Sequence, residues 1–105
     1  MTVQRIQDIL AQIDPGIHHY ECATDGTNFT VWMEYERILL DADDTGAELG
    51  WKFEVDRYTK DEYDPIAEQL EAALMAHPSI TVKPQRVQYD QVSGYIRHIF
   101  DCEAI

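Results

Sequence analysis

The segment from Gly50 to Leu74 most constrains the fold, because the spacing of its apolar residues changes along its length. Its first half alternates apolar and charged side chains, in the order Trp51, Lys52, Phe53, Glu54, Val55 and Asp56. This alternation is typical of a β-strand with one buried face. Its second half repeats apolar residues at helical spacing, at Ile66, Leu70, Ala73 and Leu74. The segment therefore predicts a strand followed by a helix that packs one stripe onto a sheet.

The ends of this helix are predicted from the residues that flank the apolar repeat. Thr59 lies three residues before Glu62, which is the spacing of a capping box, so we expect the helix to begin near Thr59. Pro65 fits a first turn, where its missing N–H has no helical partner. His77 and Pro78 interrupt the repeat and predict the end of the helix.

A shorter helix is predicted near the start of the chain. Thr2 is a suitable N-cap, and Asp14-Pro15-Gly16 is a suitable end. One apolar stripe lies between them, at Ile6, Ile9, Leu10 and Ile13. We expect this stripe to face the core.

Two hairpins complete the predicted sheet. Residues 17–22 and 29–35 flank a turn-rich segment, and residues 80–89 and 95–102 flank another, with Pro84 indicating an edge strand or a bulge. The resulting order is α-β-β-β-α-β-β. It predicts one α+β domain over residues 1–105, with a mostly antiparallel sheet and both helices packed on it.

The connection over residues 41–49 is expected to be a mobile loop, because it is acidic and has little apolar content. The whole chain is also acidic, with 20 Asp and Glu against 8 Lys and Arg and a net charge of −12. This charge argues against stable binding to nucleic acid or to an anionic membrane, since both would repel the chain.

No apolar run approaches the length of a membrane span, and no leader opens the sequence. We expect Cys22 and Cys102 to be reduced thiols in a cytosolic protein.

Glu54 and Asp56 are the strongest candidates for chemistry, because they share one strand face with Lys52 and could bind a metal for phosphodiester hydrolysis. The alternative, which we favour, is that they form the polar face of a half-exposed strand. The sequence has no Gly-rich phosphate loop, nucleophile elbow or HExxH run. We therefore predict no enzymatic activity, no cofactor and no metal, and expect exposed aromatic residues to serve a protein interface.

Four consecutive features resemble the small tail-completion, tail-terminator and minor tail proteins of tailed bacteriophages and prophages. They are the strand Trp51–Asp56, the step Tyr58-Thr59-Lys60-Asp61-Glu62-Tyr63-Asp64-Pro65, the helix Ile66–Leu74 and the hairpin Tyr89-Asp90…Ser93-Gly94-Tyr95. The resemblance implies a tail-terminator-like fold and a structural role in tail completion or head–tail joining. It also implies a ring, by analogy a hexamer, that contacts tail-tube and connector proteins in the virion and is assembled in the host cytoplasm.

Ring contacts are expected from sheet edges, the acidic loop and neighbouring aromatic residues. The candidate interface residues are Trp32, Asp41, Asp43, Asp44, Glu48, Trp51 and Tyr58. The acidic composition would suit a lumen through which DNA passes without adhering. It equally suits a second class, a small acidic binding module such as an immunity protein, antitoxin or DNA mimic that neutralises a basic partner. A metal-dependent hydrolase is the third alternative.

Overall fold

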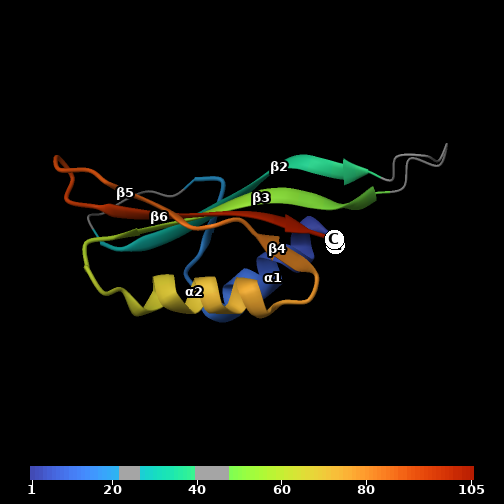
Figure 1. Ribbon diagram of the computed structural model, residues 1–105, viewed down its shortest axis with the longest axis horizontal. Helices are drawn as coiled ribbons and strands as arrows, with labels where there is room; N and C mark the ends of the chain where they lie inside the picture. Colours follow the sequence, from blue (N-terminus) through green and yellow to red (C-terminus); the bar gives the residue numbers. More distant parts are fainter. Residues whose placement is uncertain (22–26, 40–47) are drawn as a thin grey trace.

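The sheet of this protein carries both helices on one face (Figure 1). The computed structural model describes residues 1–21, 27–39 and 48–105. Its elements are α1 (Val3–Ile13), β1 (His18–His19), β2 (Phe29–Leu39), β3 (Glu48–Thr59), α2 (Pro65–Ala76), β4 (Ile80–Val82), β5 (Arg86–Tyr89) and β6 (Ile96–Ala104). Within these residues the strand order is β1-β2-β3-β6-β4, and β5 also pairs with β6. Every pairing except β1 with β2 is antiparallel, which confirms the predicted α+β class.

Helix α1 begins and ends where the sequence predicts. The Thr2 hydroxyl accepts a hydrogen bond from the Arg5 backbone N–H at 3.1 Å, and the Asp14 N–H donates to the Leu10 carbonyl as the helix ends. Ile6 and Leu10 are buried, so the predicted stripe faces the core.

The predicted cap of α2 at Thr59 is wrong, and Asp64 is the N-cap. Strand β3 continues to Thr59, which pairs with Ile96 of β6, and the Thr59 hydroxyl accepts from the Asp61 N–H instead. The Asp64 carboxylate accepts from the Ile66 N–H at 3.3 Å, with Pro65 in the first turn as predicted. Because the chain pairs within the sheet up to Thr59, the helix begins later in the sequence than predicted, after a short loop.

The predicted first hairpin is also wrong, because β1 runs parallel to β2. His18 pairs with Val31 and His19 with Trp32, and the Tyr20 N–H donates to the Trp32 carbonyl. Tyr20 has a φ of 75°, in the left-handed region, and β1 ends at His19 just before it.

Strand β3 begins earlier than predicted, inside the segment expected to be a mobile loop. Glu48 pairs with Leu39, and Gly50 pairs with Ile38. A Cβ at Gly50 would lie 1.7 Å from the Ala104 carbonyl oxygen, so this glycine permits close approach of two strands. The remainder of the predicted loop, residues 41–47, lies outside the described residues.

The closing hairpin is confirmed, with one strand divided. The Asp90 N–H donates to the Tyr95 carbonyl, and Gly94 turns the chain with a φ of 78°. The predicted strand 80–89 is split at Pro84 into β4 and β5, which pair with successive parts of β6. Proline cannot donate to the ladder, which explains the interruption.

The hydrophobic core lies between the helices and the covered face of the sheet. Leu70 and Leu74 of α2 are fully buried, as the sequence predicts, and the sheet supplies the large side chains Trp32, Phe53 and Phe100. The Trp32 indole N–H donates to the Gln7 side chain at 2.7 Å, which satisfies its polar atom within the core.

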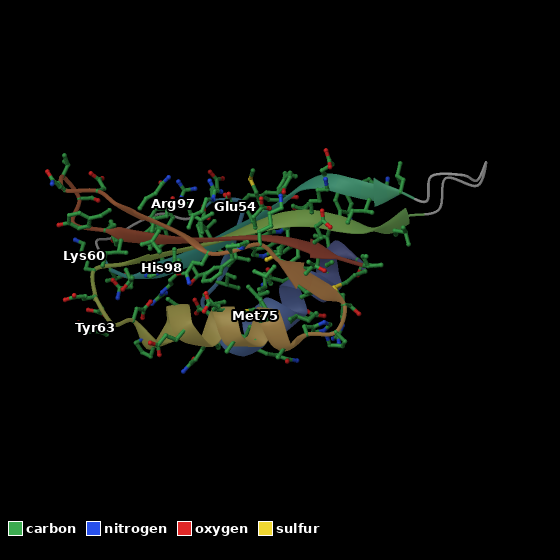
Figure 2. The ribbon with its side chains drawn as sticks, viewed as in Figure 1. Glu54, Lys60, Tyr63, Met75, Arg97 and His98 are labelled. Carbon is green, nitrogen blue, oxygen red and sulfur yellow. The ribbon has the colours of Figure 1, made fainter. Side chains whose placement is uncertain are left out.

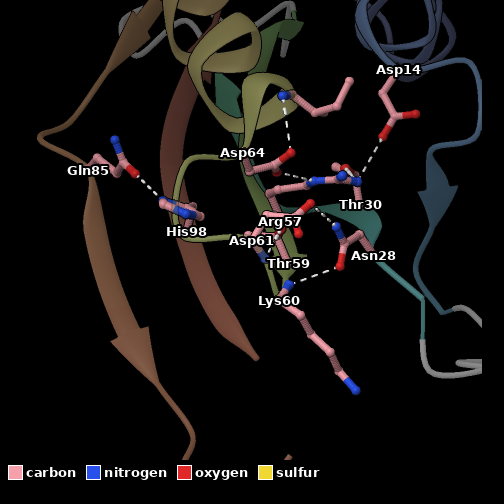
Figure 3. Close-up of polar contacts among 11 residues, drawn as sticks. Asp14, Asn28, Thr30, Arg57, Thr59, Lys60, Asp61, Asp64, Gln85 and His98 are labelled. Carbon is pink, nitrogen blue, oxygen red and sulfur yellow. Dashed lines mark hydrogen bonds and ion pairs between the residues drawn. The ribbon is translucent and has the colours of Figure 1, made fainter. Parts of the chain in front are cut away.

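A buried arginine joins the helices to the sheet (Figure 3). Arg57 of β3 is 7% exposed, and its guanidinium contacts the Asp64 carboxylate at 2.7 Å and the Thr30 hydroxyl at 3.2 Å. It also lies 3.7 Å from Asp14, which ends α1. One side chain thus connects β2, β3 and the ends of both helices that face it.

We expect Leu70→Ala to lower the free energy of unfolding by about 2–5 kcal/mol, because the substitution leaves a cavity in the core. Urea denaturation measures this change. Met75→Ala is the matched control, since Met75 lies on the same helix and is exposed. A loss for Leu70→Ala no greater than that of the control would contradict the packing described.

We expect Asp64→Ala to cost about 3–5 kcal/mol, because it leaves the Arg57 guanidinium buried without its ion-pair partner. The change also removes the cap of α2. Glu62→Ala is the control, since Glu62 is an exposed acid of the same loop and a surface change of this kind costs roughly 0.5 kcal/mol or less. Equal denaturation midpoints for the two variants would refute the role given to Asp64.

Candidate interaction surface

The sheet face opposite the helices, here called the open face, is not covered by either described helix (Figures 1 and 2). Residues paired across neighbouring strands point to the same side, so the register defines its members. They are Phe29, Val31, Met33 and Glu36 of β2, Lys52, Glu54, Asp56 and Tyr58 of β3, Arg86 and Gln88 of β5, and Arg97, Ile99, Asp101 and Glu103 of β6. Tyr35 of β2, in the bulge before Glu36, joins them through its bond to Asp101. In Figure 2, Glu54 and Arg97 lie on this face, whereas Met75 lies on the helical side.

One end of the open face is aromatic. The rings of Phe29 and Tyr58 stack with centroids 4.7 Å apart, and Tyr95 meets both edge-on. Cations lie over two of these rings, Arg97 over Tyr58 and Lys60 over Tyr95. A cavity of about 270 Å³ opens beside this cluster, lined by Tyr58, Gln88, Tyr89, Asp90, Ser93, Tyr95 and Arg97. Such aromatic and arginine side chains are enriched in protein interfaces.

The middle of the open face is a network of carboxylates and arginines. The Arg97 guanidinium donates to Asp56 at 2.7 Å and lies 3.6 Å from Glu54, which Arg86 also approaches. Burial and the neighbouring Asp56 carboxylate raise the pKa of Glu54, and Arg97 and Arg86 only partly oppose this. A protonated Glu54 can donate to Asp56, whose Oδ1 is buried and otherwise without a partner among the described residues.

The other end of the open face is held by two polar contacts. The Tyr35 hydroxyl donates to Asp101 at 2.6 Å, and this bond, with burial, raises the pKa of Tyr35. The Lys52 ammonium lies 2.7 Å from Glu36. These contacts fix side chains that would otherwise be free to rotate on an exposed strand.

Positive charge is concentrated on the open face. Of the eight Lys and Arg residues in the chain, five lie on it or beside it: Lys52, Lys60, Lys83, Arg86 and Arg97. The exposed acids Asp8, Glu62 and Glu68 lie instead on α1, before α2 and on α2. The helical side is therefore acidic, while the charges of the open face are largely balanced.

The four predicted interface residues that the structure describes do not form one cluster. Trp32 is 1% exposed and belongs to the core, so its surface is not available to a partner in this subunit. Trp51 is half-buried with Arg37 over its ring, and Tyr58 lies in the aromatic end of the open face. Glu48 begins β3. Asp41, Asp43 and Asp44 lie outside the described residues.

Glu54 and Asp56 do lie side by side, but they face arginines. No group of three or more His, Cys, Asp or Glu able to hold a metal occurs among the residues that the structure describes. Lys52, the third member of the proposed hydrolytic set, contacts Glu36 instead. The thiol of Cys102 is buried, which raises its pKa to about 12 and disfavours the thiolate.

Residues 1–21, 27–39 and 48–105 contain no helix that is long and apolar enough to cross a bilayer.

Sequence reasoning missed several residues of the open face. Phe29 and Tyr95 complete the aromatic cluster, and Arg97 joins it to the carboxylates. The alternation at residues 29–35 was a usable signal, because it placed Phe29, Val31, Met33 and Tyr35 on one side. The alternation does not indicate which of the two sides the helices cover.

These features define an α+β protein with an antiparallel sheet, two helices on one face and a charged, partly aromatic open face. The same fold occurs in a chain of the structure titled "Virion of native gene transfer agent (GTA) particle", with a TM-score of 0.53 and 12% sequence identity. The likeness covers 95% of this chain and 85% of that one, and at this identity it shows a shared fold. No family model and no curated protein matches the sequence.

We expect Glu54→Gln to raise stability at neutral pH and to flatten its pH dependence. Because the pKa of Glu54 is raised in the fold, its stabilisation is complete below the ordinary value of 4.5 and is lost as the pH rises through the raised value. Glutamine keeps a donor for Asp56 and does not titrate. Urea midpoints between acidic and neutral pH test this, with the exposed Glu62→Gln as control. A constant difference from the unmodified protein at every pH would contradict the assignment.

Proposed function

We propose that this chain is a structural protein of a phage-type virion, acting in tail completion or head–tail joining as a ring of identical subunits. The ring is a hexamer by analogy with tail terminators. Its partners are further copies of itself and the tail-tube and connector proteins, and it resides in the virion after assembly in the host cytoplasm.

The observation that carries the proposal is the fold likeness to a virion chain over nearly the full length of both proteins. A match of this extent compares whole subunits, so it supports a common type of building block. The separate resemblance of Trp51–Leu74 and the closing hairpin to tail-completion proteins points in the same direction.

The distribution of charge supports the same role. An acidic surface repels the phosphate backbone, so an acidic helical side can border passing DNA without retaining it. When a surface has balanced charges and exposed aromatic side chains, its desolvation on contact with another protein costs less free energy. We propose that the open face and the sheet edges contact protein, that no reaction is catalysed and that no cofactor is needed.

A small acidic binding module is the alternative function, favoured by the net charge of −12. Such a module would capture a basic partner through long-range attraction. It would have no requirement for a ring, and its removal would leave particles intact.

Deleting the gene from an inducible prophage or phage that carries it tests the proposal. We expect lysates with unjoined heads and tails, or with tails of aberrant length, under the electron microscope. Complementation with the unmodified gene, and with Glu54→Gln, is expected to restore infectious particles, because the role does not depend on acid–base or metal chemistry at Glu54. Normal infectious virions from the deletion strain would contradict the proposed role in assembly.

A further inference from the structure

The described sheet has two long borders with different chemistry. One is the outer side of β2 beyond Trp32, where β1 stops pairing. The other is formed by β5 and β4, which pair with β6 on one side only among the described strands. Unpaired strand edges present main-chain donors and acceptors to any strand that can approach them.

We propose that the outer edge of β2 in one copy pairs with the outer edge of β5 in the next copy. The occupant of each edge is therefore a second copy of this chain. The inference rests on the proposed ring and specifies its subunit contact.

The β2 edge is long and partly apolar. Residues 33–39 pair with β3 on one side, and no described strand pairs with their other side. Met33, Tyr35 and Leu39 are each about half exposed, at 45%, 48% and 52%. A long, exposed and partly apolar strand edge is uncommon unless another element covers it, because a strand of another chain can pair with it.

The β5 edge is shorter but more exposed. Each of its four residues is exposed, with Val87 at 57% and Tyr89 at 64%. The Asp90 N–H donates to the Tyr95 carbonyl, and hydrogen-bonded and non-hydrogen-bonded pairs alternate along an antiparallel ladder. The backbone N–H groups of Val87 and Tyr89 therefore point away from β6, toward the open edge.

The two edges complement each other better than either complements itself. The outer half of β2 carries two acids, Glu34 and Glu36, and one cation, Arg37, whereas β5 carries one charged residue, Arg86. The Glu34 carboxylate is buried and contacts His19 of β1 at 2.8 Å, so Glu36 is the exposed acid of the β2 edge. Pairing β2 with a second β2 would place the exposed Glu36 of both copies along one seam, in a chain that is already at −12. Pairing β4 with another copy is hindered, because β4 has only three residues and Pro84, two residues after it, lacks a donor.

The contact joins two different surfaces of the same chain, so each copy keeps one free β2 edge and one free β5 edge. Such head-to-tail contacts generate a ring when the rotation between copies closes. A β2–β2 contact would instead stop at a dimer. The proposed edge pairing therefore provides the kind of contact that a ring requires.

Cross-linking between two variants tests this pairing. Tyr35→Cys on β2 and Gln88→Cys on β5 place thiols on the open face of either edge, in a Cys22→Ser background that leaves Cys102 buried. The two proteins are mixed and treated with a short bismaleimide, both at high concentration and in particles carrying both variants. We expect cross-linked dimers roughly tenfold above the control mixture of Gln4→Cys with Gln88→Cys, since contact raises the effective concentration of the thiols.

Proline substitution provides an independent test. Val87→Pro removes an outward N–H without removing a bond to β6, and we expect it to abolish oligomers. Val87→Ala keeps that N–H and is expected to assemble, with thermal melts establishing that both variants fold. Assembly by folded Val87→Pro would overturn the proposed pairing.

The outcomes separate this inference from the proposed function. Rings or particles that contain the chain but give cross-links only between two Tyr35→Cys copies, or only to another virion protein, would refute the edge pairing and leave the virion role standing. A chain that is absent from particles and forms no oligomer at any concentration would contradict both.

Discussion

The fold depends on the contact between Arg57 and Asp64. A guanidinium buried in the sheet is costly unless a carboxylate faces it, and Asp64 supplies that carboxylate while its other oxygen caps α2. Asp14 approaches the same guanidinium from the end of α1. Both helices are consequently fixed at one end to the same strand, and the apolar stripes of both helices are directed onto one face of the sheet. The opposite face remains open because the chain has no third helix among its described residues to cover it.

This one-sided arrangement also separates the charges. The exposed acids of the helices lie on one side, while most of the Lys and Arg side chains meet carboxylates or aromatic rings on the other. An acidic chain thereby gains a face on which protein contact carries little electrostatic cost.

Much of the fold could be predicted from local sequence, because helix stripes and caps depend on near neighbours. The stripe through Leu70 and the cap at Thr2 are examples. The cap at Asp64 could not be chosen over Thr59, since both satisfy the local rule and the pairing of Thr59 with β6 decides between them. The burial of Trp32 was equally undetermined, because both sides of β2 carry large apolar residues and only the position of the helices selects one. The open-face charge network depends on strand register, which single-sequence alternation does not fix.

The central claim is that this chain is a component of the particle itself. The most direct measurement is electron cryomicroscopy of purified particles from a strain that produces the chain, with a small tag at its C-terminus to locate the subunit. The account predicts a ring of subunits with this fold at the junction of head and tail or at the end of the tail tube. Particles that are complete and infectious but contain no copy of the chain would contradict it.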